Sequence, residues 1–255
     1  MKKRISLVLV ALLLISCAFS LTACGVSNSG DWDKAIDKFK TADAVTVKIK
    51  DDNLTMGYLV NREHLVCNGE IAFDATQGVV YIVMNTSRGT GFIDVDPSKG
   101  TDEWYYVIDG TTVNCYHRHT SQYSEGEWEV SKIMTFTTRD EAVEFLRDKY
   151  LHPVDIDEKA IPTFLEMGYR GEEIKGTNNT VNKENLFKNK FTLKYSDNRF
   201  AYTYVMKFSL SGDVSKFTYK HKSAERGHVD DKRTTTIAVK YKANITLPGD
   251  LPAAK

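Results

Sequence analysis

Five residues in the first half of the chain have side chains that commonly bind metal ions: His64, Cys67, Cys115, His117 and His119. Cysteine sulfur and histidine nitrogen are the usual ligands of zinc, and a His-x-His pair on a strand can chelate one ion. However, their spacing matches no closed zinc motif, and a disulfide would use both cysteines. We therefore interpret the histidines as exposed side chains of a polar sheet face, with the thiols nearby in the core. We expect neither a metal nor another cofactor.

Cys67 and Cys115 can also serve the fold rather than chemistry. Outside the cytoplasm the pair can form a disulfide, and a bridge closing so long a loop would stabilise the protein by roughly 4 kcal/mol in the chain-entropy model. The alternative is two separate buried thiols, which pack as small hydrophobic groups. The sequence leaves both arrangements open.

Neighbouring carboxylates occur twice, at Glu125 and Glu127 and at Glu172 and Glu173. Two carboxylates perform acid and base catalysis when their pKa values are pushed apart, whereas neighbours in a loop are usually solvated. The chain also contains no Gly-x-Ser-x-Gly, no His-Glu-x-x-His and no phosphate-binding glycine loop. We therefore assign no catalytic residue and expect no enzymatic activity.

Three aspartates, Asp94, Asp96 and Asp102, lie around Pro97. Carboxylate oxygens of this kind bind calcium, but known calcium loops place their oxygen ligands more densely. We interpret this segment as a solvated turn.

The N-terminus has the pattern of a secretion signal. Met1-Lys2-Lys3-Arg4 is basic, the segment from Ile5 to about Ala18 is apolar, and small residues precede Cys24. A membrane-spanning helix needs about 20 apolar residues, and this run is shorter and ends in small and polar residues. We therefore predict that residues 1–23 form a signal peptide.

Leu21-Thr22-Ala23-Cys24 resembles the lipobox of bacterial lipoproteins. The resemblance implies attachment of a diacylglyceryl group to the Cys24 thiol, cleavage between Ala23 and Cys24, and usually acylation of the new amino terminus. Two or three acyl chains hold a protein on a membrane, because each buried methylene contributes about 0.8 kcal/mol. Leu14-Ile15-Ser16-Cys17 fits a lipobox loosely but cuts the apolar core short, so Cys24 is preferred. We expect an extracytoplasmic protein with a lipid anchor in the cell membrane and a flexible tether over residues 24–30.

The charge of the chain is balanced, with 34 basic and 34 acidic residues. The basic residues are scattered along the sequence, whereas nucleic-acid binding draws most of its affinity from a concentrated cationic face. We expect no nucleic-acid partner and no polybasic membrane patch.

Two segments have the apolar period of a helix. Residues 31–40 place Trp32, Ala35, Ile36 and Phe39 on one stripe. A second helix is predicted to start at Thr138, because Glu141 stands at the third helical position, as in a capping box. A third short helical piece is expected within 156–167.

Strand patterns follow the first helix. Val45, Val47 and Ile49 alternate with polar residues, which indicates a half-buried strand. Further strand-like segments cover residues 54–60, 64–67, 71–74, 79–85, 91–95, 104–109 and 112–119. Turn signals separate them at 51–53, 68–69, 76–78, 88–89, 97–100 and 109–110. Because the connections are short, we expect these strands to pair as antiparallel neighbours.

The C-terminal third has the clearest strand pattern. Large apolar side chains occupy every second position of one segment: Phe200, Tyr202, Tyr204, Met206, Phe208 and Leu210. This period predicts an apolar row on one sheet face. A returning strand follows over 214–221, a final strand carries Ile237 and Val239, and residues 249–255 are expected to be a disordered tail.

The order of these elements resembles the LolA-like lipoproteins, a group that includes carriers of the LppX and LprG type. The resemblance covers residues 31–248 and rests on the lipobox, a short helix, an antiparallel meander, helices in the middle and aromatic-rich closing strands ending in Asn244-Ile245-Thr246-Leu247-Pro248. It implies a single α+β domain, mostly an antiparallel sheet curved into a half-barrel and covered by a few helices. It also implies a concave face that holds acyl chains, for which the row from Phe200 to Leu210 is the candidate. The same row fits the inner face of a β-sandwich.

These patterns together predict a non-enzymatic lipoprotein of the bacterial cell envelope. We expect it to bind a hydrophobic or amphipathic ligand, or a protein partner, on its sheet. The alternatives are an interaction module with a filled core, which binds an envelope polymer or a protein, and an envelope hydrolase whose site residues are dispersed. The consecutive Trp104, Tyr105 and Tyr106 must point to both faces of a strand, where they either contact a partner or are buried.

Overall fold

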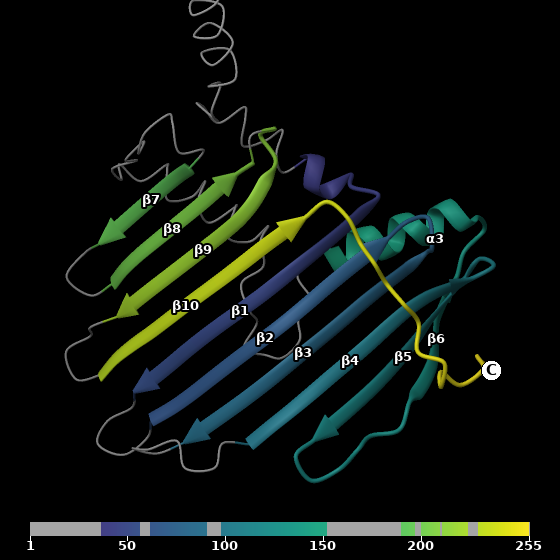
Figure 1. Cartoon of the computed structure of the whole chain (residues 1–255), viewed down its shortest axis with the longest axis horizontal. Coiled ribbons are helices and arrows are strands. Elements are labelled where there is room, and N and C mark those ends of the chain that lie inside the picture. Colours follow the sequence, from purple (N-terminus) through teal and green to yellow (C-terminus); the bar gives the residue numbers. More distant parts are fainter. Residues whose placement is uncertain are drawn as a thin grey trace, which may run out of the picture.

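The structure is a computed structural model that describes residues 37–56, 62–90, 98–151, 190–196, 200–209, 211–223 and 229–254. Its strands are β1 (Ala44–Met56), β2 (Arg62–Asp74), β3 (Val79–Thr90), β4 (Ser98–Asp109), β5 (Thr112–Ser121), β6 (Glu129–Thr135), β7 (Lys190–Ser196), β8 (Phe200–Phe208), β9 (Val214–Ser223) and β10 (Val229–Lys240). Among the described residues, these ten strands form one antiparallel sheet in the order β6-β5-β4-β3-β2-β1-β10-β9-β8-β7 (Figure 1). The predicted antiparallel β fold with few helices is confirmed.

The sheet consists of two meanders joined at one seam. β1 to β6 pair in chain order, and so do β7 to β10, because each connection is short enough to place the next strand beside the last. The two meanders meet where β1 pairs with β10, with Ile49 opposite Ile237 and Asp51 opposite Thr235. This seam is the one pairing in the described sheet between strands that are distant in sequence.

A buried carboxylate crosses this seam. Asp51 accepts hydrogen bonds from Arg233 Nε and Nη2, both at 3.0 Å, and from Thr235 Oγ1 at 2.6 Å. The side chain of Asp51 is 1% exposed and that of Arg233 18%. A buried charge is tolerated when it is paired and its hydrogen-bonding capacity is used, as it is here. The network therefore ties the position of β10 to that of β1.

Two helical segments follow the first meander, the α-helix α3 (Arg139–Leu146) and a π-helical turn η1 (Arg147–Leu151). The predicted capping box is confirmed: Thr138 Oγ1 accepts from the backbone N–H of Glu141, whose carboxylate accepts from the backbone N–H of Thr138. Ala142, Val143 and Leu146 are buried against the sheet. At the N-terminal side, residues 37–40 of the predicted first helix are helical, and Phe39 is buried.

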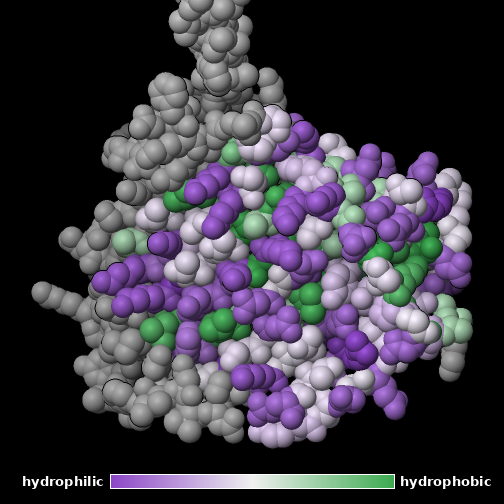
Figure 2. Space-filling view, in the orientation of Figure 1, coloured by the Kyte–Doolittle hydropathy of each residue, from purple (hydrophilic) through white to green (hydrophobic). Residues whose placement is uncertain are grey.

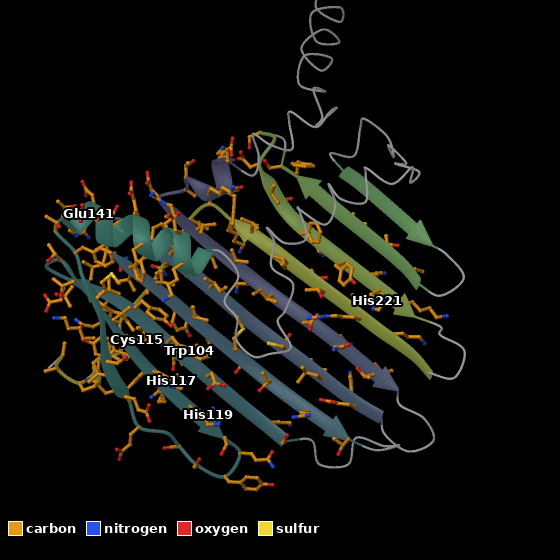
Figure 3. All side chains as sticks on the ribbon, turned by 180° about the vertical axis from the view of Figure 1, so that it is seen from behind. Trp104, Cys115, His117, His119, Glu141 and His221 are labelled. Carbon is orange, nitrogen blue, oxygen red and sulfur yellow. The ribbon has the colours of Figure 1, made fainter. Side chains whose placement is uncertain are left out.

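The two faces of the sheet are covered by different elements. The helix-side face is the one on which α3 lies, as Figure 3 shows. Residues 241–254 cross the opposite, tail-bearing face over the first meander (Figure 1). The helix-side face carries the main core, whose largest fully buried side chains are Phe39, Phe73, Phe217, Ile82, Met84, Leu146, Ile237, Val45 and Val80. The smaller core of the tail-bearing face contains Ala72, Val79, Tyr105, Tyr116 and Ile245.

The predicted turns at 51–53 and 68–69 are wrong, because β1 and β2 run straight through them. Asp51 is a strand residue, since its partners come from β10. Gly69 is also a strand residue, and a Cβ built there would overlap the sulfur of Met84 on β3. Asp51 and Gly69 are each required by a contact with another strand. Their residue types therefore give a misleading turn signal.

Residues 88–89 are likewise part of β3, and β4 begins at Ser98 within the predicted turn 97–100. The turns at 76–78 and 109–110 are confirmed, with Gly78 and Gly110 at φ of 69° and 62°. These conformations lie in the left-handed region, which glycine adopts without steric cost.

The predicted disorder of the tail 249–255 is wrong for residues 249–254. Asp250 accepts a hydrogen bond from Trp128 Nε1 at 3.2 Å and lies 3.7 Å from Arg118 Nη1, and Leu251 packs on the smaller core. Thr46 on β1 donates to the carbonyl of Lys242 at 2.8 Å. The tail is therefore a strap across the sheet. The short sequence after Leu247-Pro248-Gly249 gave no sign of the partners it meets there.

Several predictions fall outside the described residues. These are the signal peptide 1–23, the tether 24–30 with Cys24, and the helical piece 156–167. In the part of the chain that the structure describes, no helix is long and apolar enough to cross a membrane.

Replacing Asp51 with alanine should lower the free energy of unfolding by about 3 kcal/mol, because the largely shielded Arg233 then loses the carboxylate that compensates its charge. Urea unfolding followed by circular dichroism measures this loss. Asp52→Ala is the matched control, since that neighbouring carboxylate is 64% exposed and pairs with the surface residue His64 at 3.0 Å. An Asp51→Ala loss no larger than that of the control would contradict the structural role of the network.

Candidate functional site

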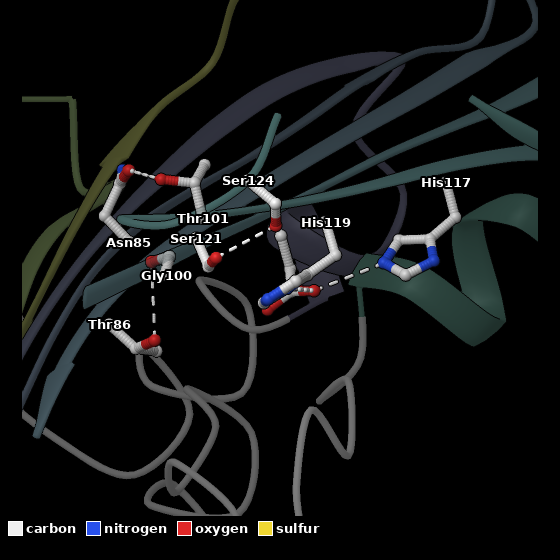
Figure 4. A network of polar contacts seen from close by, with 9 residues as sticks. Asn85, Thr86, Gly100, Thr101, His117, His119, Ser121 and Ser124 are labelled. Atoms are coloured by element: carbon white, nitrogen blue, oxygen red, sulfur yellow. Dashed lines mark hydrogen bonds and ion pairs between the residues drawn. The ribbon is translucent and has the colours of Figure 1, made fainter. Parts of the chain in front are cut away.

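A partly exposed polar cluster on the helix-side face is formed by Asp102, His117 and His119. Asp102 Oδ1 lies 3.2 Å from His117 Nε2 and 2.8 Å from His119 Nδ1, so two imidazoles share one carboxylate oxygen (Figure 4). β4 supplies the aspartate and β5 the histidines, and the register places Asp102 opposite His119. We call these three residues the His–Asp–His cluster.

Trp104 extends the cluster toward the middle of the sheet. It lies opposite His117, and the two rings stack with centroids 4.9 Å apart and planes 13° from parallel. Trp104 and His117 are half-buried, whereas the side chain of His119 is 53% exposed. Figure 3 shows these side chains on the same face as Cys115. An accessible aromatic surface therefore adjoins polar groups.

Each imidazole uses one ring nitrogen for Asp102 and has a second, which can donate to or accept from a ligand. The carboxylate holds both rings in place, as a second-shell carboxylate orients a metal-bound histidine. Among the described residues, no group of three or more histidine, cysteine and acidic side chains is arranged to hold a metal ion. The second ring nitrogens of His117 and His119 suit the cluster to recognising a polar group by hydrogen bonds.

The helix-side face changes character along its strands. Its α3 end is apolar, with Val45, Phe73, Val80 and Val113 beneath or beside the helix. Its opposite end, which we call the distal end, carries the His–Asp–His cluster, the Asp51 network, His221 opposite Arg233, and Thr86 hydrogen-bonded to Gly100 O at 3.4 Å (Figure 4). One continuous face thus joins a large apolar area to a polar end.

Cys67 and Cys115 are both free and buried, so the predicted alternative of two separate thiols is confirmed and the disulfide is wrong. They lie on β2 and β5, with β3 and β4 between them. Three strand spacings separate them by at least about 14 Å, twice what a disulfide can span. Burial, and next the nearby Asp51 carboxylate, raises the pKa of Cys67 to about 11, and burial raises the pKa of Cys115.

The predicted ligand row lies on β8 and just beyond it. Phe208 is buried in the main core, and the exposed Ala201 and Lys207 alternate with the row as expected. The side chains of Phe200, Tyr202, Tyr204 and Met206, and all of Leu210, lie outside the described residues. The register places Tyr204 opposite Tyr219 and Met206 opposite Phe217, both on the helix-side face.

Among the carboxylates considered from the sequence, Asp102 takes part in the cluster. Glu125 and Glu127 are exposed, and the glycine between them is required because a Cβ at Gly126 would overlap the backbone of His119. Asp94 and Asp96, like Glu172 and Glu173, lie outside the described residues. Sequence reasoning missed that Asp102 meets the histidines, because only the pairing of β4 with β5 brings them together.

The consecutive aromatics are divided between both faces. Trp104 and Tyr106 belong to the helix-side face, and Tyr105 is buried on the tail-bearing face. There the ring of Tyr105 lies 4.7 Å from Tyr81 and 5.7 Å from Trp128, measured between centroids. Burial, followed by the charge of Glu103, raises the pKa of Tyr81 to about 12. These tyrosines pack against the strap.

A search of known protein families, of curated proteins and of solved structures finds no match to this chain. The site is therefore interpreted from its own geometry.

In the folded protein at pH 8, Cys67 and Cys115 should resist alkylation by iodoacetamide. A pKa of about 11 leaves roughly one thiolate in a thousand at Cys67, and burial hinders access to both. Mass mapping of the alkylated peptides measures the reaction, and both cysteines should react once the protein is unfolded in urea. Rapid modification before unfolding, or a disulfide-linked peptide pair, would show that the buried, separate thiols are wrong.

Proposed function

We propose that this protein is a lipoprotein, anchored at Cys24 to the outer surface of a bacterial cell membrane, that binds an amphipathic ligand on the helix-side face. The apolar part of the ligand lies on the apolar side chains that both meanders contribute to this face. Its polar group meets the His–Asp–His cluster and Trp104. The protein holds this ligand without chemical conversion.

One observation carries this proposal: a single sheet face joins the apolar area near α3 to a distal end where polar groups converge. An ordinary core would be apolar throughout, because buried polar groups cost free energy unless each is paired. Here the polar groups are gathered at one end and remain partly exposed, with side-chain exposures of 32% for His117 and 53% for His119. Ligand pockets commonly combine an apolar lining with a few polar groups that set the orientation.

The proposal includes the curved half-barrel shape and the α+β class implied by the LolA-like resemblance. An open sheet of this width, with the right-handed twist that strands adopt, supports such curvature. The capped helix α3, which lies on one face of the sheet, supports the α+β class.

The second candidate is an interaction module with a filled core, which binds an envelope polymer or a protein. The burial of Phe217, Ile237 and Met84 favours it, because these side chains are already packed. The two candidates differ in whether a ligand shares the core.

Native mass spectrometry of the protein after gentle extraction should show a co-purifying lipid-sized mass. Trp104→Ala should reduce the occupancy about fivefold, since an aromatic contact of this kind is worth about 1 kcal/mol. Tyr123→Ala is the matched control, because Tyr123 is 84% exposed and lies in the turn that follows β5. Protein that is free of ligand and has no internal cavity would refute ligand binding and favour the filled core.

Replacing Cys24 with alanine should move the protein from the membrane fraction to the soluble fraction after a wash in high salt. The reason is that no acyl chain can then be attached. Cys17→Ala is the control and should leave the protein on the membrane. Retention of the Cys24→Ala variant in the membrane fraction after that wash would refute the anchor.

A further inference from the structure

Exposed lysines gather on one part of the tail-bearing face. They come from β1, β8, β9 and β10, and all of them are exposed: Lys48, Lys50, Lys207, Lys216, Lys220, Lys222, Lys232 and Lys240. We call this set the lysine face. The strap runs over the first meander, so it crosses β1 but leads away from β8, β9 and β10 (Figure 1). Figure 2 shows hydrophilic side chains over β9, β10 and β1 on this face.

Strand alternation explains why lysines from distant parts of the sequence meet. On β10 the odd positions Thr235, Ile237 and Val239 are buried on the helix-side face, so Lys232 and Lys240 point to the other side. Residues directly opposite each other share a face, which extends the set from β10 to β9, β8 and β1. The basic residues are scattered along the sequence, as expected. On the folded sheet, however, many of the lysines gather on one face, so the expectation of no basic surface is wrong.

The described part of β8, β9 and β10 places no acidic side chain among these lysines on this face. Among the described side chains of β8, β9 and β10 on this face, the other residues are threonine, alanine and valine. Among the described side chains, acidic groups lie at the border of the lysine face, where Glu70 is 3.0 Å from Lys48 and Asp52 is 3.0 Å from His64. The rest of the chain must carry a compensating negative charge, because the whole is neutral.

The register also places like charges directly opposite each other. Lys207 is opposite Lys216, and both side chains are exposed. Such cross-strand pairs destabilise a sheet. An arrangement that repels itself in the free protein is stabilised when an external anion lies across it.

Protection of a sheet edge does not explain the lysines. Lysine on an edge strand prevents pairing with other chains, but the edges of this sheet are β6 and β7. All eight lysines lie on β1, β8, β9 and β10, and each of these strands is paired on both sides. The lysines therefore form a broad surface on interior strands and do not protect an edge.

We infer that the lysine face docks on the anionic phospholipid headgroups of the membrane, an inference that rests on the proposed anchor at Cys24. A membrane surface suits a broad array of exposed lysines, because its charges move laterally and need no complementary shape. Basic residues near an anionic leaflet each strengthen binding about fivefold. An acyl anchor combined with a basic surface is a recognised form of stable attachment.

The segment between Cys24 and the described chain is long enough for the lysine face to reach the membrane. The described chain begins at residue 37, thirteen positions after Cys24, which an extended chain spans in at most about 45 Å. β1 begins at Ala44, and its Thr46 is opposite Lys240 on the lysine face. The chain thus enters the sheet beside the surface that would meet the bilayer.

The test uses the Cys24→Ala chain as purified from the cells that produce it, so that no lipid contributes to binding. Vesicles of phosphatidylcholine, with and without about one third phosphatidylglycerol, are the probe. The protein should bind the anionic vesicles, and binding should fall as salt shortens the screening length from about 10 Å to about 3 Å. Combined Lys216→Gln, Lys220→Gln and Lys232→Gln should weaken this binding on the order of 100-fold.

The matched control is combined Lys99→Gln, Lys132→Gln and Lys149→Gln, which removes the same charge from β4, β6 and η1. It should bind as the parent does, and circular dichroism verifies that both variants are folded. Equal binding by the two triple variants would overturn the inference. So would displacement from the vesicles by polyphosphate at equal phosphate concentration, which would identify a soluble polyanion as the ligand.

The two proposals can fail separately. If the Cys24→Ala chain fails to bind anionic vesicles while the wild-type chain stays in salt-washed membranes, only the inference on the lysine face is overturned. Vesicle binding by the lysine face, with the wild-type chain released by salt, overturns the anchor alone.

Discussion

The pairing of β1 with β10 is the constraint on which the rest of the structure depends. Local connections build each meander, but neither meander alone determines where the other lies. Asp51 resolves this by binding Arg233 and Thr235 across the seam while excluded from water. A one-residue slip would turn every side chain of β10 to the wrong face, and it would bury a charge without its partner. The network thus specifies register as well as contributing stability.

Correct register at this seam creates both surfaces of the protein. It aligns Ile237 with Ile49 and Phe217 with Ile237, so that the main core is continuous from one meander to the other. The same alignment brings the lysines of β9 and β10 beside those of β1 on the opposite face. Ligand binding and membrane contact are therefore proposed for two sides of one sheet, and neither excludes the other.

Local patterns predicted the elements whose cause is local. The capping box of Thr138 and Glu141, the glycine turns at Gly78 and Gly110, and the alternation of β8 all depend on neighbours in sequence. The continuous strands through Asp51 and Gly69 could not be predicted, because the reasons lie in Arg233 and Met84 on other strands. The same limit applies to the His–Asp–His cluster and the strap. The residue types indicated the histidines as candidate site residues, but only the strand pairing shows that Asp102 lies between them.

The lysine face shows the difference between composition and arrangement. Balanced charge led to the expectation of no basic patch, whereas the strand period places lysines on one face and threonines between them. The central claim is that the two faces of the sheet meet different surroundings. The most direct measurement attaches a fluorophore at Thr236→Cys on the tail-bearing face or at Thr86→Cys on the helix-side face, and adds anionic vesicles with nitroxide-labelled headgroups. The account predicts strong quenching of the label at position 236 and little at position 86. Equal quenching at both positions, or stronger quenching at position 86, would contradict it.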